Sequence, residues 1–178
     1  MRGLGARAIE KNAAARRKNT FQKPRIFSMH SIPVDVRLLS PLWSQSDLRG
    51  ATPGSCGLDL MACFTEEQRV LLPGERTAVP SGLAIDIRRP GIAGFVYSRS
   101  GLGTKQGLVV SQGVGVIDPD YRGEIIVSLL NTSGEERTIT RGQRIAQLIF
   151  QPFFPAEFTV RDELTATRRG AGGFGHTG

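Results

Sequence analysis

The segment Gly113-Val-Gly-Val-Ile-Asp-Pro-Asp-Tyr-Arg-Gly123 and the run that follows it, Glu124-Ile-Ile-Val-Ser-Leu-Leu130, decide the fold class of this chain. Glycines and a proline punctuate the first segment, whereas the second is a nearly continuous run of branched apolar residues. A turn-forming segment next to such a run favours a buried β-strand over a helix. Asp118 follows Val116 and Ile117 as if it ended a strand, where a carboxylate is held rigidly and can orient and deprotonate water. The competing interpretation of Asp-Pro-Asp is an ordinary turn.

The same punctuation extends over the body of the chain from about residue 31 and leaves little room for helices. We expect an all-β sandwich or barrel, with one modest helix near Thr65–Gln68. Apolar runs such as Ile145–Phe150 predict strands buried on both faces, which indicates an oligomer. The stretches expected to be strands are Pro33–Leu39, Gly57–Phe64, Arg76–Pro80, Gly82–Ile87, Ile92–Tyr97, Leu108–Val110, Gly123–Leu130, Glu136–Ile139 and Arg144–Phe150.

Length and composition narrow the class of protein. The 178 residues match one domain, and 39% hydrophobic with 22% charged residues is typical of a soluble globular chain. No apolar stretch approaches the ~18 residues of a membrane helix, so we expect no membrane partner. Cys56 and Cys63 match neither a metal nor a redox pair and are interpreted as reduced core residues. With only His30 and His176 as further ligands, any metal is expected to arrive with a substrate.

The net charge of +7 lies entirely in the N-terminal segment, because residues 1–25 hold eight basic residues and one acidic residue. The rest of the chain is balanced, with 15 basic and 15 acidic residues. Three interpretations of this segment stay open: an organellar transit peptide, a basic arm that contacts nucleic acid or anionic lipid, and a dispensable leader that precedes a start at Met29. We favour the leader, and with it a cytoplasmic location.

Three further segments have the composition of a site. Ser98–Lys105 combines hydroxyls, glycines and two cations, as an anion cradle requires, although a polar turn explains the same composition. Gln147 and Arg144 lie within an apolar strand, where a buried amide needs partners in the backbone or in a ligand. The glycine-rich C-terminus is either a disordered tail or a mobile lid, and Arg169 and Phe174 are the residue types that clamp a phosphate and stack on a base.

Taken together and in this order, five segments resemble the motifs of the trimeric dUTPases, and the resemblance covers roughly residues 31–178. The five segments are Gly57-Leu-Asp-Leu-Met-Ala62, Arg99-Ser-Gly-Leu-Gly-Thr-Lys-Gln-Gly107, Gly115-Val-Ile-Asp-Pro-Asp-Tyr-Arg-Gly-Glu-Ile125, Gly142-Gln-Arg-Ile-Ala-Gln-Leu-Ile149 and Arg169-Gly-Ala-Gly-Gly-Phe-Gly-His-Thr-Gly178.

The resemblance implies a β-clip or distorted jelly-roll subunit that forms a homotrimer with active sites at the subunit interfaces. It divides the chain into a basic extension over residues 1–28, a β domain over 29–168 and an arm over 169–178 that closes over the nucleotide. The implied reaction converts dUTP and water to dUMP and pyrophosphate, which lowers dUTP and supplies dUMP for thymidylate synthesis. Mg²⁺ is expected on the triphosphate and on water rather than on side chains.

The resemblance also assigns roles to residues. Asp118 is the implied general base for in-line attack of water on the α-phosphorus, and Asp120 is a turn residue. The base enters a β-hairpin from Gln112 to Ile117 that reads it through the main chain. The implied substrate-binding residues are Arg99, Ser100, Gly101 and Gln147 at the phosphates; Gln112, Gly113, Val116, Ile117, Tyr121 and Ile126 at the base and sugar; and Arg169, Phe174, Gly175, His176 and Thr177 in the arm.

Two alternatives are weighed against this function. A dCTP deaminase shares the fold but carries a catalytic glutamate at the position of Ser128, so the deaminating carboxylate is missing. A binding module that has lost activity is disfavoured because Asp118, Tyr121, Gln147 and the terminal arm are all present. One departure from the family pattern is Gln112, which stands where many bacterial members have Asn and which leaves any side-chain contact to uracil open.

Overall fold

The computed structural model describes residues 31–173 and confirms the all-β prediction. Its regular elements in that range are ten strands, one α-helix and one turn of 3₁₀ helix. In chain order they are β1 (Val34–Leu38), η1 (Gln45–Asp47), β2 (Leu58–Met61), β3 (Gln68–Leu71), β4 (Arg76–Ile87), β5 (Ile92–Ser98), α1 (Ser100–Gln106), β6 (Leu108–Val110), β7 (Gly115–Ile117), β8 (Glu124–Asn131), β9 (Arg137–Thr140) and β10 (Arg144–Pro152).

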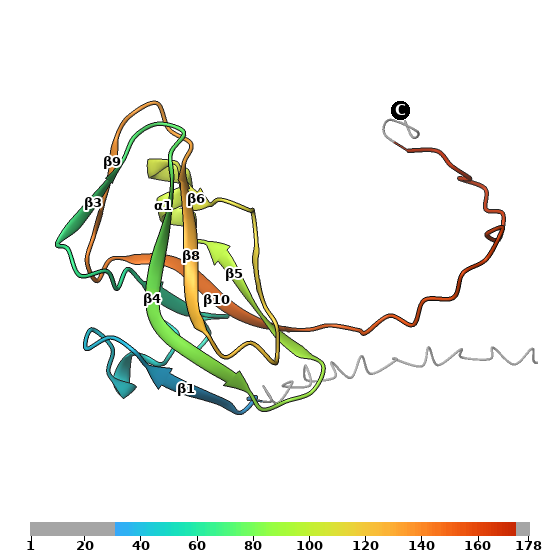
Figure 1. Cartoon of the computed structure of the whole chain (residues 1–178), viewed down its shortest axis with the longest axis horizontal. Helices are drawn as coiled ribbons and strands as arrows, with labels where there is room; N and C mark the ends of the chain where they lie inside the picture. Colours follow the sequence, from blue (N-terminus) through green and yellow to red (C-terminus); the bar gives the residue numbers. More distant parts are fainter. Residues whose placement is uncertain (1–30, 174–178) are drawn as a thin grey trace, which may run out of the picture. The chain divides into compact units, whose positions relative to one another are not determined.

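The strands form two four-stranded antiparallel sheets and a two-stranded ribbon (Figure 1). One sheet has the order β1-β4-β8-β6 and the other β2-β10-β5-β7, while β3 pairs with β9. Strands that pair in each sheet are far apart in the sequence, as β2 and β10 are. Both sheets are therefore assembled by long-range pairing. This is the distorted jelly-roll architecture that the resemblance implies.

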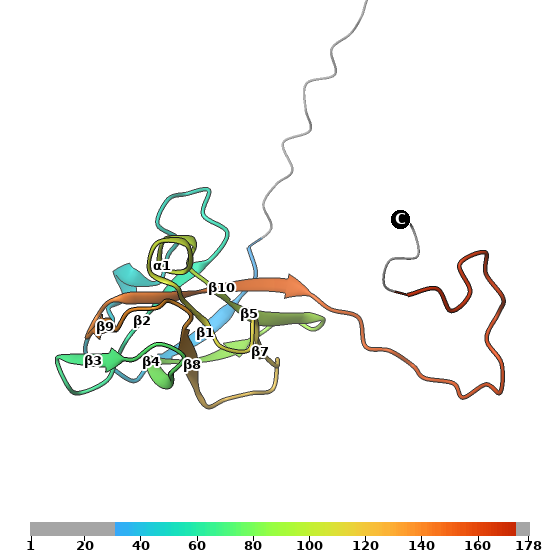
Figure 2. The same ribbon diagram turned by 90° about the horizontal axis from the view of Figure 1, so that it is seen from above.

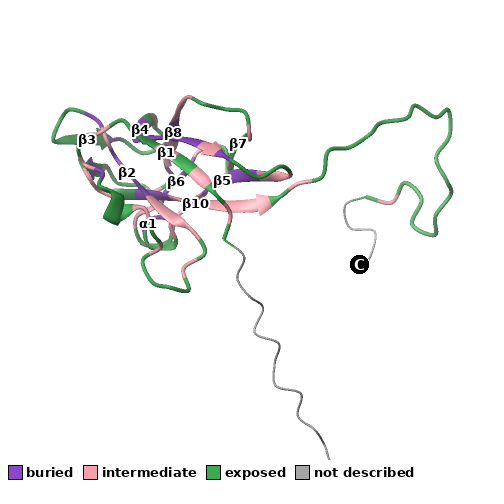
Figure 3. Cartoon of the chain, turned by 90° about the horizontal axis from the view of Figure 1, so that it is seen from below, coloured by how far each residue is buried: buried purple, intermediate pink, exposed green. Residues whose placement is uncertain are grey.

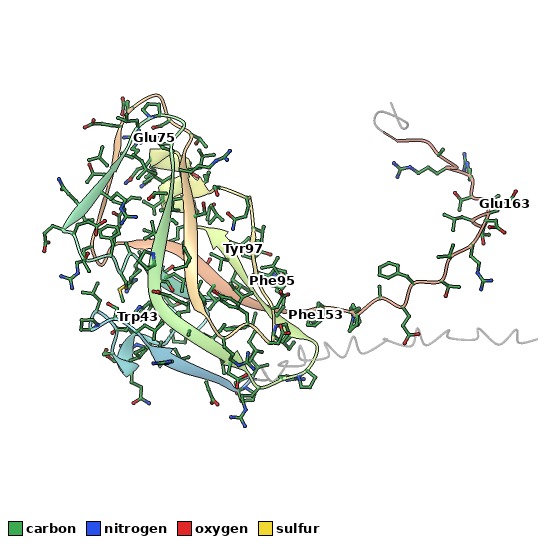
Figure 4. The ribbon with its side chains drawn as sticks, viewed as in Figure 1. Trp43, Glu75, Phe95, Tyr97, Phe153 and Glu163 are labelled. Carbon is green, nitrogen blue, oxygen red and sulfur yellow. The ribbon has the colours of Figure 1, made fainter. Side chains whose placement is uncertain are left out.

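Apolar side chains from both sheets form one core, and Figure 3 colours the buried residues of the strands purple. Leu83, Val127 and Leu129 come from the first sheet, and Leu60 and Leu148 come from the second; all are at most 1% exposed. Trp43 closes one side of this core and donates its indole N–H to the carbonyl oxygen of Ser81 at 2.7 Å (Figure 4). A core of this kind holds the strands rigidly, which fixes any side chain at their ends.

Strand β4 is one strand of twelve residues rather than the two that the sequence predicts. Its pairing with β8 shifts between Pro80, opposite Ile126, and Ala84, opposite Glu124. The Glu124 carboxylate accepts the N–H of Gly82 at 2.7 Å inside this bulge. The proline and glycine therefore mark a β-bulge within a continuous strand, which a sequence pattern cannot distinguish from a strand end.

The predicted helix near Thr65–Gln68 is wrong, and a helix occurs elsewhere. Residues 65–67 form a bend and Gln68 begins β3, because that segment pairs with β9. The helix is α1, within the segment expected to be an anion cradle or a polar turn. Its glycines are poor helix formers, and burial of Leu102 compensates for that weakness. Gly107 ends α1 at φ 69°, where a Cβ would approach the Ser133 backbone nitrogen to 2.9 Å.

In the apolar run of β8, burial on both faces is not achieved within one chain. In β8, Ile125, Val127 and Leu129 are buried, whereas Ile126 on the opposite face is 47% exposed. Leu130, on the same face as Ile126, is half-buried. The apolar run therefore encodes one face for the core and a second, outward face.

The sequence predicts that both cysteines are reduced core residues, and the structure agrees only in part. Both thiols are free; Cys63 is half-buried, but Cys56 is exposed, so its prediction as a core residue is wrong. Burial raises the pKa of the Cys63 thiol.

Residues 154–171 are exposed and without regular structure beyond isolated bends and turns, and Glu163 lies within them (Figure 4). Within residues 31–173, no helix has the length and apolar character needed to cross a membrane.

Candidate functional site

Two arginines converge on one carboxylate at the end of the second sheet. The Asp59 side chain accepts from Arg99 Nε at 3.0 Å and from Arg99 Nη2 at 3.2 Å, and Arg144 Nη1 lies 3.4 Å from it. Arg99 Nη1 also donates to the Arg144 carbonyl oxygen at 3.1 Å. We call Asp59, Arg99 and Arg144 the ion-pair cluster. It carries one net positive charge, since two guanidinium groups share one carboxylate.

Strand pairing explains why these residues meet. Strand β10 lies between β2 and β5, and Gln147 stands opposite Asp59 on one side and Tyr97 on the other. Directly paired residues project from the same face of a sheet, so the Gln147 amide lies on the face that carries Asp59. Arg99 follows β5 directly and caps α1, whose first residues Ser100 and Gly101 are exposed.

Partial burial and a two-point contact hold Asp59 and Arg99 together, whereas the Arg144 side chain is 56% exposed. The Asp59 side chain is only 17% exposed, and its bidentate contact with Arg99 fixes the plane of that guanidinium. A carboxylate withdrawn from water needs such partners, because an unpaired buried charge is strongly unfavourable. The cluster therefore keeps a surplus positive charge beside Asp59, with the Arg99 guanidinium held in place, which suits an anionic ligand.

A cleft opens next to the ion-pair cluster, between η1 and strands β2 and β10. Asp59 and Arg144 line it together with the segment around η1. Within that segment the Ser44 N–H donates to Asp47 Oδ2 at 2.8 Å. The pKa of Asp47 is lowered, chiefly by the hydrogen bond from the Ser44 hydroxyl. The residues that line the cleft are Trp43, Ser46, Asp47, Arg49, Gly50, Ala51, Leu58, Asp59, Met61 and Arg144.

Asp118 lies directly after β7, so the prediction that it ends a strand is confirmed. The Tyr121 N–H donates to the Asp118 carbonyl oxygen at 3.1 Å, and the Tyr121 hydroxyl donates to the Glu124 carbonyl oxygen at 2.9 Å. These bonds fix the turn over residues 118–121 on which the carboxylate sits. The Asp118 side chain is exposed, and among residues 31–173 no cation lies within ion-pair distance of it.

The segment from Gln112 to Ile117 is a turn followed by β7, rather than a hairpin of two paired strands. Strand β7 pairs with β5, with Val116 opposite Phe95, whereas the preceding β6 pairs with β8 in the other sheet. The segment therefore crosses from one sheet to the other, because each strand finds its partner in a different layer. Gly113 stands at the turn with φ 81° and donates its N–H to the Val110 carbonyl oxygen at 3.0 Å.

Three apolar side chains within eight residues of Asp118 in the sequence are exposed in the single chain. Val116 is 59%, Ile126 47% and Tyr121 43% exposed. Isolated exposed apolar residues are ordinary, but a group beside a free carboxylate indicates a surface that a ligand or another chain covers. We call Asp118, Val116, Tyr121 and Ile126 the exposed group.

Asp118 follows β7 near the start of β5, whereas Arg99 follows the end of β5; Figure 2 shows β7 beside β5. Ile117 pairs with Gly94 near the start of β5, and Arg99 comes five residues later in the chain. At about 3.3 Å per residue the two ends are separated by roughly 17 Å along the strand. One chain therefore does not bring the predicted base Asp118 to the predicted phosphate-binding residue Arg99.

The model of the dUTPase family matches residues 45–178 of the chain. The chain belongs to the dUTPase family. It is 48% identical over 150 residues to the deoxyuridine 5'-triphosphate nucleotidohydrolase of Desulfitobacterium hafniense strain DCB-2, covering 84% of this chain and 99% of that protein. It is 46% identical over 147 residues to the enzyme of the same name from Escherichia coli K12, covering 82% and 97%.

Solved dUTPase structures are similar to this chain. A mutant dUTPase of Staphylococcus bacteriophage 80alpha with dUpNHpp aligns with a TM-score of 0.71 at 25% identity, covering 83% of this chain and 99% of that one. A mutant dUTPase from phage phi11 of S. aureus, whose structure describes the coordination of a structural Mg(II) ion, aligns with a TM-score of 0.64, covering 75% and 99% at 25% identity. The resemblance stated from the sequence is thereby confirmed at the level of family and fold.

The structure identifies one dUTPase-motif residue to which the sequence assigned no role. Asp59 belongs to the first motif, but only the fold shows that it unites Arg99 and Arg144. The available signal was a carboxylate between Leu58 and Leu60 in a predicted strand, because a charge there needs a partner. In the arm, Arg169 donates to the Gly172 carbonyl oxygen at 2.8 Å. Phe174, Gly175, His176 and Thr177 lie outside the described residues.

Proposed function

We propose that this dUTPase-family chain hydrolyses dUTP to dUMP and pyrophosphate, lowering dUTP and supplying dUMP for thymidylate synthesis. Membership of the family supports the substrate and the reaction class. The observation that carries the mechanism is the division of the site: a fixed cationic cluster at one end of β5 and a free carboxylate beside exposed apolar residues at the other. A nucleotide offers both halves a matching part, since its phosphates are anionic and its base is apolar and planar.

The division of the site supports a homotrimer in which different copies complete each active site. The ion-pair cluster and Asp118 lie roughly 17 Å apart along β5 in one chain, which is too far for a single water and phosphate to bridge. Association places the Asp118 end of one chain next to the Arg99 end of another and covers the outward face of β8 around Ile126. A closed ring of identical contacts satisfies both requirements.

Asp118 acts in this proposal as the general base. In this role the carboxylate must be held where it can orient the attacking water. The turn bonded through Tyr121 supplies that positioning. The carboxylate orients a water for in-line attack on the α-phosphorus and accepts its proton, and the bond to the bridging oxygen of pyrophosphate breaks. Asp120, exposed in the same turn, has no role in this step.

The phosphates are held by cations, amides and backbone N–H groups. Arg99, Ser100 and Gly101 line the α- and β-phosphates, and Gln147 reaches the α-phosphate from the face that carries Asp59. Arg169, His176 and Thr177 of the arm hold the γ end. Mg²⁺ on the phosphate oxygens and water would neutralise charge on the leaving pyrophosphate, in keeping with its reluctance to dehydrate.

The base and the sugar are bound by the segment from Gln112 to Ile117 and its neighbours. Main-chain groups of Gly113, Val116 and Ile117 would pair with uracil, and the close backbone leaves no room for a 5-methyl group. Tyr121 packs on the deoxyribose and excludes a 2′-hydroxyl, Ile126 completes the pocket, and Phe174 and Gly175 of the arm cover the base. Selectivity then rests on hydrogen bonds that a wrong base leaves unpaired.

The test is a comparison of pyrophosphate release from dUTP, dTTP, dCTP and UTP with Mg²⁺ present, combined with native mass spectrometry. We expect release from dUTP at least a hundredfold faster than from the other three, and a threefold particle. Equal turnover of the four nucleotides would contradict the assigned specificity, and ammonia release from dCTP would support the deaminase alternative. The cytoplasmic location and its organellar alternative depend on residues 1–28, which lie outside the described residues.

A further inference from the structure

The C-terminal end of α1 is attached to the turn between β8 and β9. Arg137, the first residue of β9, donates its Nε–H to the carbonyl oxygen of Gln106, the last residue of α1, at 2.8 Å. The N–H and the hydroxyl of Thr132 both donate to the Gly107 carbonyl oxygen, each at 2.8 Å. The last carbonyl groups of a helix have no partner within the helix, so these bonds satisfy groups that α1 cannot pair by itself.

The turn that receives the end of α1 is held by a buried amide. Asn131 is fully buried, and its Nδ2 group donates to the carbonyl oxygens of Leu71 at 3.0 Å and of Glu135 at 2.8 Å. Its Oδ1 accepts the N–H of Ser133 at 3.0 Å. The amide therefore pairs with backbone groups on both sides of the turn, which gives α1 a rigid support.

The sequence of α1 makes this attachment important. Leu102 is the buried residue of the helix, and Gly101 and Gly103 are weak helix formers. The Arg137 side chain is 25% exposed, so its bond to the Gln106 carbonyl oxygen is partly shielded from water. Attachment at Gln106 therefore adds a second fixed point to the one that Leu102 provides.

The other contacts of the Arg137 guanidinium are weaker than its bond to α1. Ser133 Oγ lies 3.2 Å from Nε and shares the single Nε proton with the closer carbonyl oxygen of Gln106. Nη1 lies 3.2 Å from Glu135 Oε2, but the Glu135 side chain is 77% exposed. An ion pair so open to water contributes little. The contact with Gln106 is therefore the main one.

We propose that Arg137 is a positioning residue for the phosphate-binding segment: it fixes the C-terminal end of α1 and thereby the place of Ser100 and Gly101. The inference rests on the proposed function, which assigns these two residues to the α- and β-phosphates. Ser100 lies six residues before Gln106, about 9 Å along the helix at ~1.5 Å per residue. A tilt at Gln106 therefore displaces Ser100, and a displacement of about 1 Å is enough to impair an oriented reaction.

The first experiment measures nucleotide binding by Arg137→Met, which keeps a long apolar side chain but removes the charge and the donors. Calorimetry with Mg²⁺ present gives the affinity for dUpNHpp, and inhibition of dUTP hydrolysis gives the affinity for deoxyuridine, which has no phosphate. We expect dUpNHpp to bind roughly three- to tenfold more weakly and deoxyuridine to bind within about twofold of the unchanged protein. Arg88→Met is the matched control, because Arg88 also pairs with an exposed carboxylate, and it changes neither affinity.

The second experiment follows α1 itself by hydrogen–deuterium exchange without nucleotide. Arg137→Met should raise the exchange rate of the amides of residues 103–107 and leave that of the core strand β8 unchanged. Glu135→Gln removes the exposed ion pair but keeps the bond between Arg137 and Gln106. This variant should therefore leave both the exchange of α1 and the affinity for dUpNHpp within about twofold.

Four results would overturn the inference. They are unchanged exchange in α1, unchanged dUpNHpp affinity of Arg137→Met, equal weakening of dUpNHpp and deoxyuridine, and an effect of Glu135→Gln equal to that of Arg137→Met. Failure of the proposed function gives a different result. The unchanged protein would then neither bind dUpNHpp nor hydrolyse dUTP, whereas the exchange of α1 would still respond to Arg137→Met.

Discussion

The two ends of strand β5 are built on opposite principles. At one end, Arg99 is locked by Asp59 and Arg144 through contacts that the chain makes by itself. At the other, Asp118 has no ion-pair partner within residues 31–173, and Val116 and Tyr121 beside it are exposed. One chain therefore forms the charge-stabilising half of the proposed site by itself but leaves the half around Asp118 open. In the proposed function, a second chain and a nucleotide complete the open half.

The largest effect is expected at the open end. Asp118→Asn removes the proton acceptor while keeping the size of the side chain, so kcat for dUTP should fall by about 10²- to 10⁴-fold with little change in binding of dUpNHpp. Steady-state pyrophosphate release and calorimetry measure the two quantities. Asp120→Asn in the same turn is the control and should retain activity. Comparable turnover by Asp118→Asn would remove Asp118 from the role of base.

The second-largest effect tests whether the C-terminal arm covers the nucleotide at the Asp118 end of β5. Deletion of residues 169–178 should lower kcat/KM for dUTP by roughly 100-fold, because the proposed lid no longer excludes water or holds the γ-phosphate. Thermal unfolding and oligomer size should stay unchanged, since residues 154–171 are exposed. Phe174→Ala should reproduce only part of the loss, through reduced nucleotide affinity. Unchanged kinetics after the deletion would contradict the lid.

Substitution within the ion-pair cluster, at the Arg99 end of β5, should lower activity less than the changes above. Asp59→Asn keeps the side-chain shape but removes the charge that aligns two guanidinium groups, so we expect roughly a tenfold loss in kcat/KM and a melting temperature lower by several degrees. Asp35→Asn is the matched control, because it also breaks an aspartate–arginine contact, with Arg88 at 2.6 Å. Both partners of that pair are more than half exposed, so its loss should be negligible. Equal effects of the two variants would show that the ion-pair cluster contributes no more to activity or stability than the exposed Asp35–Arg88 pair.

The smallest effect concerns the stability of the fold at acid pH and involves Asp47, in the cleft next to the ion-pair cluster. The pKa of Asp47 is lowered from 3.8, chiefly by the Ser44 hydroxyl, so the folded protein binds the Asp47 proton less readily than the unfolded chain. This contribution is therefore present above pH 3.8 and is lost as the pH falls through the folded value. Asp47→Asn should slightly flatten the fall in melting temperature between pH 5 and 3, and Asp162→Asn in the exposed segment 154–171 is the control.

Local patterns predicted most strands of this fold, and long-range pairing explains what they missed. The branched stretches gave strands close to their observed limits, as in Leu108–Val110. The sequence could not distinguish the bulge at Gly82 from a strand end, because that distinction depends on Glu124 more than 40 residues away. It likewise missed α1, whose glycine-rich segment becomes a helix only through burial of Leu102. Asp59 gained its partners from two strands that only the sheet brings together.

In the proposed trimer, Arg99 and Asp118 of one active site come from different chains. This arrangement can be tested by mixing an Arg99→Gln variant with an Asp118→Asn variant under conditions of subunit exchange. In an equal mixture, about a quarter of the sites combine two intact contributions, so we predict that roughly a quarter of unmutated dUTP hydrolysis returns from two nearly inactive proteins. If native mass spectrometry shows mixed oligomers but hydrolysis stays at the level of the separate variants, both residues must act from the same chain and the claim is wrong.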